Sequence, residues 1–357
     1  MELLSVTMND GVKPRSEIEG KDNSSEDKSN YKIVRKGDMV YNSMRMWQGA
    51  NGISPCDGIV SPAYTVLMPK QEINNGYFAT LFKSANLINE FRKNSQGMTS
   101  DTWNLKYPQI ETIKVQIPSV SEQDKVSEMF SVLDERIAAQ SQLVESLKKY
   151  KRGVVRTLLS PKRCSIKNVK WTTSRIGDIG TFIKGAPLSK ADISLEGTPF
   201  ILYGELYTTY SEVISNVVRR TQASADKQYY SQIGDVIIPT SGETPEEIST
   251  ASCVMLPDII LAGDLNIYRC TQVDGRIMSY ILNHVVNDRI ARIAQGKSVV
   301  HVQAAEISKI EITYPDPFSQ KTIIAILAAI SDRIDQSNAE LRLLHELRKA
   351  LLQKLFI

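Results

Sequence analysis

Two stretches of the chain carry the same pattern of apolar residues, spaced alternately four and three positions apart. The first runs from Ser121 to Ser160 and the second from Phe318 to Ile357. An apolar repeat that averages 3.5 residues is typical of a coiled coil, so each stretch is predicted to be one long helix. At 1.5 Å per residue, each apolar stripe is roughly 50 Å long. The seam positions expected between the helices include Val126, Ile137, Gln140, Leu158, Ile323, Ile334, Ser337 and Leu355.

The second stretch is a copy of the first at a constant offset of 197 residues, and the copy extends upstream. Matched pairs at this offset are Gly37 and Gly234, Pro118 and Pro315, Gln123 and Gln320, and Ile137 and Ile334. A repeat of this length predicts two large units, each a globular part followed by a long helix. Two full units would need 394 residues, 37 more than the 357 of the chain. We therefore expect the first unit to lack a counterpart of Pro161–Gly197.

Short strands and helices alternate in both globular parts, which predicts an α+β fold class. The first part is expected to hold a helix over Gly76–Asn94 and a last strand over Ile110–Ile117; the second is expected to hold a helix over Asp274–Ala294 and a strand over Ile310–Thr313. The predicted boundaries are 1–119 for the first globular part, 120–160 for the central helix, 161–317 for the second globular part and 318–357 for the C-terminal helix.

Composition narrows the class of protein. The net charge is only +3, which argues against a strongly basic domain that coats nucleic acid without sequence preference. This small charge is compatible with local basic loops. The four cysteines lie far apart, without CxxC or Cys/His spacing, which favours free thiols in a reducing cytosol over a metal site or disulfides. No apolar run approaches the roughly 18–20 residues of a membrane span, and nothing resembles a signal peptide, so we expect a cytoplasmic protein without membrane contact.

Motifs of catalysis are missing from the sequence. It contains no Walker loop, no HExxH and no metal-ligand cluster. The run from Tyr314 to Phe318, YPDPF, superficially resembles the DPPF motif of adenine methyltransferases, but its order differs and no Gly-rich cofactor loop accompanies it. We expect no catalytic residue, no metal and no cofactor on this chain.

The two-unit plan, the matched helix starts at Pro118–Gln123 and Pro315–Gln320, the Gly-Asp turns and the run NSMRMWQGANG at Asn42–Gly52 resemble one family. That family is the specificity subunit of type I restriction-modification systems, and the resemblance covers the whole chain. It implies that each globular part is a target-recognition domain that reads one half of a split site in double-stranded DNA. The shortened first unit departs from the family pattern.

The resemblance also implies partners. The long helices would hold two methyltransferase (modification) subunits, and restriction/translocase subunits would join through the complex. Adenine methylation and restriction would then be carried out by those partners, with S-adenosylmethionine and ATP bound only there. Two alternatives remain open: a truncated, silent specificity cassette that donates its second domain by recombination, and a coiled-coil scaffold whose globular parts bind protein.

Polar loops are the candidate sites of base recognition, because base edges are recognised by side chains with paired donors and acceptors. The Gly-flanked loop Ser43–Ile53 and the polar loop Thr240–Thr250 occupy the same place in the two units but differ in sequence. Trp47 is as suited to packing its loop as to touching DNA. The candidate DNA contacts are Arg45, Trp47, Gln48, Asn51, Thr99, Asn104, Lys184, Ser241, Lys297, Ser298 and His301.

The direction of the helix pair follows from symmetry. A two-fold relation between the units matches the symmetry of the DNA backbone and requires antiparallel helices. Gln140 and Ser337 lie near the midpoints of their helices, where a buried polar pair can set the register of the seam. An antiparallel pair brings Val126 near Leu355, whereas a parallel pair brings it near Ile323. The predicted architecture is therefore two α+β domains separated by two long helices in an antiparallel coiled coil.

Overall fold

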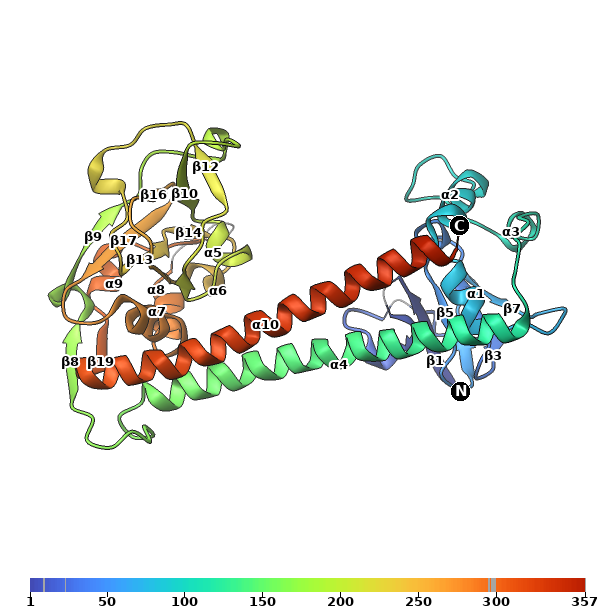
Figure 1. Ribbon diagram of the computed structural model, residues 1–357, viewed down its shortest axis with the longest axis horizontal. Helices are drawn as coiled ribbons and strands as arrows, with labels where there is room; N and C mark the ends of the chain where they lie inside the picture. Colours follow the sequence, from blue (N-terminus) through green and yellow to red (C-terminus); the bar gives the residue numbers. More distant parts are fainter. Residues whose placement is uncertain (9, 23, 295, 297–299, 357) are drawn as a thin grey trace. The chain divides into compact units, whose positions relative to one another are not determined.

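The computed structural model divides into two compact units, and in each of them short strands are combined with helices (Figure 1). Unit 1 comprises Met1–Leu143 and Ser337–Ile357, and unit 2 comprises Val144–Gln336. The structure describes residues 1–8, 10–22, 24–294, 296 and 300–356. Each unit takes in part of both long helices. The predicted α+β fold class is confirmed.

Unit 1 is built on two small sheets. Its elements are β1 (Glu2–Thr7), β2 (Gly11–Pro14), η1 (Arg15–Glu17), β3 (Lys32–Val34), β4 (Met39–Asn42), η2 (Met46–Gln48), β5 (Asn51–Ile53), β6 (Gly58–Val60), β7 (Tyr64–Leu67), α1 (Asn75–Leu81), α2 (Ala85–Asn94), α3 (Tyr107–Ile110) and the first part of α4 (Val120–Leu158). One sheet has the order β2-β1-β6-β3, with β1 and β6 parallel, and the other has the order β5-β4-β7. Aromatic side chains, among them Phe91 and Phe130, fill the core between the second sheet and the helices.

Unit 2 repeats this plan with more strands. Its elements are β8 (Trp171–Arg175), η3 (Ile176–Asp178), β9 (Gly180–Lys184), η4 (Lys190–Asp192), β10 (Thr198–Leu202), α5 (Glu205–Thr208), β11 (Val213–Ile214), β12 (Arg219–Thr221), η5 (Lys227–Tyr229), β13 (Asp235–Pro239), β14 (Ser241–Gly242), α6 (Pro245–Ile248), β15 (Ser252–Val254), β16 (Ile260–Ala262), β17 (Leu265–Cys270), α7 (Gly275–His284), α8 (Asn287–Ile293), β18 (Val300–His301), α9 (Ala304–Ser308), β19 (Glu311–Pro315) and the first part of α10 (Pro317–Leu355).

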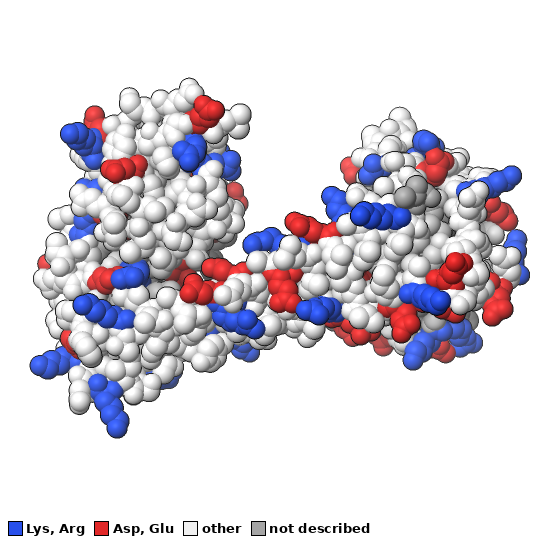
Figure 2. Space-filling view, viewed as in Figure 1, with Lys and Arg blue, Asp and Glu red and all other residues white. Residues whose placement is uncertain are grey.

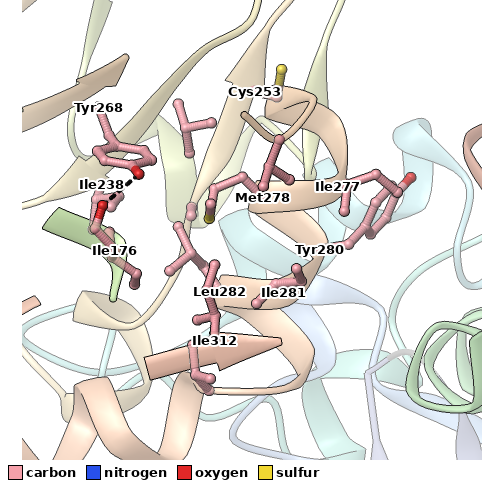
Figure 3. Packing of buried hydrophobic residues seen from close by; sticks show 14 of the residues in the cluster. Ile176, Ile238, Cys253, Tyr268, Ile277, Met278, Tyr280, Ile281, Leu282 and Ile312 are labelled. Atoms are coloured by element: carbon pink, nitrogen blue, oxygen red, sulfur yellow. Dashed lines mark hydrogen bonds between the residues drawn. The ribbon is translucent and has the colours of Figure 1, made fainter. Parts of the chain in front are cut away.

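The central sheet of unit 2 has the order β11-β15-β13-β17-β9, and β13, β17 and β9 lie side by side in Figure 1. Separate ladders join β12-β10-β16, β14-β18 and β19-β8. The main core packs α7 against the central sheet (Figure 3), with Ile281 fully buried. In the same view the hydroxyl of Tyr268 donates to the carbonyl of Ile176 at 2.8 Å, which ties β17 to η3.

The helix pair is antiparallel within unit 1. Arg136 contacts Glu340 at 2.9 Å, and nearer the start of α4 the Phe130 ring lies 6.0 Å from that of Phe356. Residue numbers therefore fall along α4 as they rise along α10. Gln140 is buried and its Nε2 donates to the carbonyl of Ser337 at 2.9 Å, which places the polar pair opposite each other in the seam.

Seam positions differ in burial. Ile334 is buried and Ile137 half-buried, and in unit 2 Leu158 and Ile323 share one core cluster. Leu355 is a correction: its side chain is 46% exposed, and Phe356 is buried in its place. The cause is the aromatic core of unit 1, which accepts the Phe356 ring and turns Leu355 outward, although Val126 and Leu355 still line the same pocket.

Two expectations for unit 1 are wrong in detail. The predicted helix over 76–94 is two helices, because the Ser84 side chain accepts a hydrogen bond from the Leu87 amide and begins α2 anew. The predicted strand over 110–117 does not form: α3 ends at Ile110 and residues 111–119 make no strand. In unit 2 the corresponding segment forms β19 because it pairs with β8, and the described residues of unit 1 hold no such partner.

A buried glutamine fixes the start of each long helix. In unit 1, Gln123 accepts from the Asn74 amide at 3.0 Å and donates to the Pro118 carbonyl at 2.9 Å. In unit 2, Gln320 repeats both bonds, to the Asp274 amide and a proline carbonyl. Asn74 and Asp274 are the N-cap residues of α1 and α7. One side chain therefore joins the long helix to the first helix of its globular part.

Unit 2 also holds a buried ionic cluster. The Glu212 carboxylate lies 2.7 Å from the Lys151 ammonium on α4 and 2.7 Å from the His284 ring on α7, and Tyr280 packs under the ammonium. Burial raises the pKa of Glu212, but the hydrogen bond from His284 and the charge of Lys151 outweigh burial and lower it to about 2. The carboxylate thus stays ionised and ties α4 to α7.

Candidate nucleic-acid interface

In unit 1 the polar loop after β4 folds into the short helix η2, which carries Arg45 at its N-cap together with Trp47 and Gln48. Gly49 ends η2 with φ of 84°, in the left-handed region that favours glycine. Arg45, Trp47 and Gln48 are all half-buried, so each keeps part of its side chain at the surface. The loop presents a cation, an indole and an amide close together in sequence.

Two loops far apart in sequence meet through tryptophans. The Trp47 ring lies 5.2 Å from that of Trp103 in an edge-to-face arrangement, and the Arg92 guanidinium lies over Trp47 at 5.8 Å. The indole N–H of Trp47 donates to the Met44 carbonyl at 3.1 Å. Trp47 thus packs the loop rather than projecting freely, and it joins the loop after β4 to the loop over residues 96–104.

The loop over 96–104 is a small hairpin in which Gln96 and Asn104 exchange two backbone hydrogen bonds of 3.0 and 2.8 Å. Thr99 is exposed at its turn, where its amide and carbonyl bond to Thr102. Asn104 is half-buried, and its Oδ1 has no hydrogen-bond partner among the described residues. Thr99 is the better placed of the two for contact with a ligand.

Asn51 does not fit a direct contact with bases and is a correction. It is fully buried in β5, where its Nδ2 donates to the Gly49 carbonyl at 3.1 Å. The burial follows from the tight packing of this strand: a Cβ at Gly52 would lie 2.8 Å from the Cα of Gly11. Asn51 therefore stabilises the backbone of the loop through its bond to Gly49.

In unit 2 three candidates gather at one end of the central sheet. Lys184 is exposed at the end of β9, opposite Asn266 at the start of β17. Ser241 pairs with His301 across the β14-β18 ladder, and the Thr240 amide donates to the Asp264 carbonyl beside β17. His301 is exposed. Lys297 and Ser298 lie outside the described residues, a few positions before β18.

Ser241, another candidate DNA contact, is also buried and does not fit a direct contact with bases. Its side chain is buried, its Oγ donates to Asp264 Oδ2 at 2.9 Å, and its carbonyl accepts from the Tyr207 hydroxyl at 2.7 Å. Burial raises the pKa of Tyr207, with the nearby Glu247 charge adding to the effect, so Tyr207 remains a hydrogen-bond donor. Ser241 holds the loop after β13 in place, and among the candidates that the structure describes in unit 2, Lys184 and His301 have accessible side chains.

Charge on the surface is mixed. On the face drawn in Figure 2, lysines and arginines are interspersed with acidic residues, and no single-sign field covers either unit. Two cations in the last turn of α2, Arg92 and Lys93, were not among the residues predicted from the sequence: Arg92 lies over Trp47, and Lys93 lies 2.7 Å from the Glu90 carboxylate. Their signal was their position: they end an amphipathic helix directly before the loop over 96–104.

Other kinds of site find no support in the residues that the structure covers. No group of three or more His, Cys, Asp or Glu side chains is arranged to hold a metal ion there. In the same part of the chain, no helix is long and apolar enough to cross a membrane.

The family of the chain follows from its sequence and fold together. The model of the family described as the type I restriction modification DNA specificity domain matches residues 5–149 and again residues 168–345. The chain belongs to this family, and its two matches correspond to the two units of the repeat.

Solved structures share the fold. A chain from a study of complex assembly and conformational transition of the type I R-M system aligns with a TM-score of 0.60 and 17% sequence identity, over 93% of this chain and 84% of that chain. The S subunit of a type I restriction-modification system from M. genitalium aligns with a TM-score of 0.59 and 16% identity, over 91% of this chain and 84% of that chain. No curated protein matches the sequence.

Proposed function

We propose that this chain is a noncatalytic specificity subunit whose two units each read one half of a bipartite site in double-stranded DNA. The observation that carries the proposal is the contrast between the units. They share a scaffold, including the glutamine at each helix start. The corresponding loops differ, because the loop after β4 packs through Trp47 on Trp103, whereas the loop after β13 is held by the Ser241–Asp264 hydrogen bond. Different loops on one scaffold suit the recognition of two different half-sites.

We further propose that two methyltransferase subunits bind along the long helices and that restriction/translocase subunits join through them. S-adenosylmethionine and ATP would be bound by these partners, and the chain would direct adenine methylation without taking part in the chemistry. The family supports this arrangement, and the isolated chain is then expected to show neither S-adenosylmethionine binding nor methyl transfer in equilibrium dialysis and tritium-transfer assays.

In unit 1, direct recognition would come from Arg45, whose donors match the guanine edge, and from Gln48, whose amide donor and acceptor match the adenine edge. Arg92 and Lys93 would contact phosphates, and such contacts position the protein without carrying sequence information. In unit 2 the corresponding candidates are Lys184 and His301. A base contact sets sequence preference, whereas a phosphate contact affects all sequences alike, and this difference can be measured.

The experiment is a selection from random duplexes by the chain assembled with its methyltransferase partners. A bipartite consensus is expected. Arg45→Ala or Gln48→Ala should relax one half-site by about 1–3 kcal/mol per lost bidentate contact while leaving the other half-site unchanged. Lys36→Ala is the matched control, since Lys36 is an exposed cation at the Gly37 turn in the same unit. It should leave both half-sites intact.

Each outcome has a defined meaning. Selection of only one half-site, that of unit 2, would identify a silent cassette, and selection of no sequence would favour a protein-binding scaffold. If Arg45→Ala and Gln48→Ala both left sequence preference untouched, the assignment of this loop to base recognition would be wrong.

A further inference from the structure

Strand β17 in unit 2 is paired along both edges, whereas its counterpart in unit 1 is paired along one. β17 pairs with β13 and β9. In unit 1, β7 pairs with β4 through Met39 and Leu67, the positions of Val236 and Tyr268 in unit 2. Among the described strands, none lies along the other edge of β7, although the carbonyl of Tyr64, at the start of β7, accepts a hydrogen bond from the Lys32 ammonium. The β7 backbone therefore presents an open sheet edge.

A second contact of unit 2 also lacks its equivalent. β19 pairs with β8 over five residue pairs, from Glu311–Arg175 to Pro315–Trp171, and Ile312 is 2% exposed. The corresponding segment of unit 1, residues 114–118, forms no strand, and Val115, at the position of Ile312, is 38% exposed. Both open positions in unit 1 are thus those that β8 and β9 occupy in unit 2.

A pocket adjoins the open segment. It has a volume of about 1000 Å³ and is lined by apolar side chains together with polar ones, including Leu81, Lys114, Val115, Ile117, Val126 and Phe356. In unit 2, Ile166 packs against the core from the segment before β8. The Phe182 ring of β9 lies 4.7 Å from that of Tyr268, on the central sheet. One continuous segment therefore closes the corresponding surface of unit 2.

We propose that the open edge of β7, the segment 114–118 and the adjoining pocket form a docking site for an extended segment of another polypeptide chain that resembles residues 166–185. Such a segment would add one strand to β7 and pair a second with residues 114–118, so that backbone hydrogen bonds supply affinity and apolar side chains supply register. A second copy of the chain fits less well, because its own segment is already paired with β17 and β19.

The probe is a synthetic peptide of residues 166–185, which contains no cysteine, added to the full chain. Hydrogen exchange by mass spectrometry should show slower exchange in β7 and in residues 114–118. At a peptide concentration 100 times its Kd, exchange through openings that release the peptide should slow by about 100-fold. A scrambled peptide of the same composition is the control and should leave exchange unchanged.

Register is tested by a disulfide. In unit 2, Phe182 lies opposite Tyr268, whose counterpart is Leu67, so a Phe182→Cys peptide should crosslink to Leu67→Cys. Val66→Cys is the matched control, because adjacent strand residues point to opposite faces and Val66 packs in a different core cluster from Leu67. Hydrogen exchange measured without peptide checks that both variants fold.

Preferential crosslinking at Leu67→Cys, together with protection of β7, supports the docking site. Three results would overturn it: no protection at saturating peptide, equal crosslinking at both positions, or protection confined to β17 and β13, which would show that the peptide replaces the strand of unit 2 instead.

Discussion

The glutamine at the start of α10 offers a sharp test of how the long helix is joined to its domain. Gln320 is 3% exposed, and its side chain bonds to the Asp274 amide and the Pro315 carbonyl at 2.8 Å each. Gln320→Leu keeps most of the volume but leaves both backbone groups buried without a partner. Each such group costs about 1–3 kcal/mol, so we expect a loss of about 2–6 kcal/mol in the free energy of unfolding.

The assay is urea denaturation followed by circular dichroism, with hydrogen exchange to locate the loss. Faster exchange is expected at the start of α7 and at the end of β19, the two segments that Gln320 joins. Gln336→Leu is the matched control on the same helix, since Gln336 is exposed and should change stability by no more than about 0.5 kcal/mol. An equally small change for Gln320→Leu would refute the role of the side chain as a joint.

Three further outcomes are expected. The pKa of Glu212 is about 2 in the folded state and near 4.5 in the unfolded state, so its contribution to stability is present above pH 4.5 and is lost as pH falls towards 2. Glu212→Gln should therefore reduce the pH dependence of the free energy of unfolding of unit 2 between these values, and it should leave the Lys151 ammonium without its counter-charge. Ile334→Asp should destabilise the helix pair by several kcal/mol in thermal melts, whereas the exposed Asp335→Asn should not; equal melts would contradict the seam. Native-state hydrogen exchange should be faster in β7 than in β17 because β7 has an open edge, and equal protection would show that the edge is covered.

Long-range periodicity was the most informative signal in the sequence. The seam predicted helices over 121–160 and 318–357, and α4 and α10 span Val120–Leu158 and Pro317–Leu355. A 3.5-residue repeat sustained over many turns depends on the helix itself and one partner, so local pattern is sufficient. At the end of α10, where the partner is an aromatic core rather than a helix, the pattern placed Leu355 in the seam although Phe356 is buried.

Strands and site residues depend on distant partners and were less predictable. Residues 110–117 have the composition of a strand, but a strand forms only where another pairs with it, as β8 pairs with β19 in unit 2. Asn51 and Ser241 have the chemistry of base contacts, yet packing from β2 and from Asp264 buries them. The link between Trp47 and Trp103 joins loops about fifty positions apart, which no local pattern reveals.

The glutamine joints also bear on how such proteins diversify. Each joint is made between a long helix and the globular part directly before it: Gln123 bonds to Asn74, and Gln320 bonds to Asp274. A genetic crossover within a long helix, beyond its glutamine, would transfer a globular part and its joint together. The incoming globular part would keep its own glutamine contacts, so whole globular parts could be exchanged without rebuilding the start of the long helix.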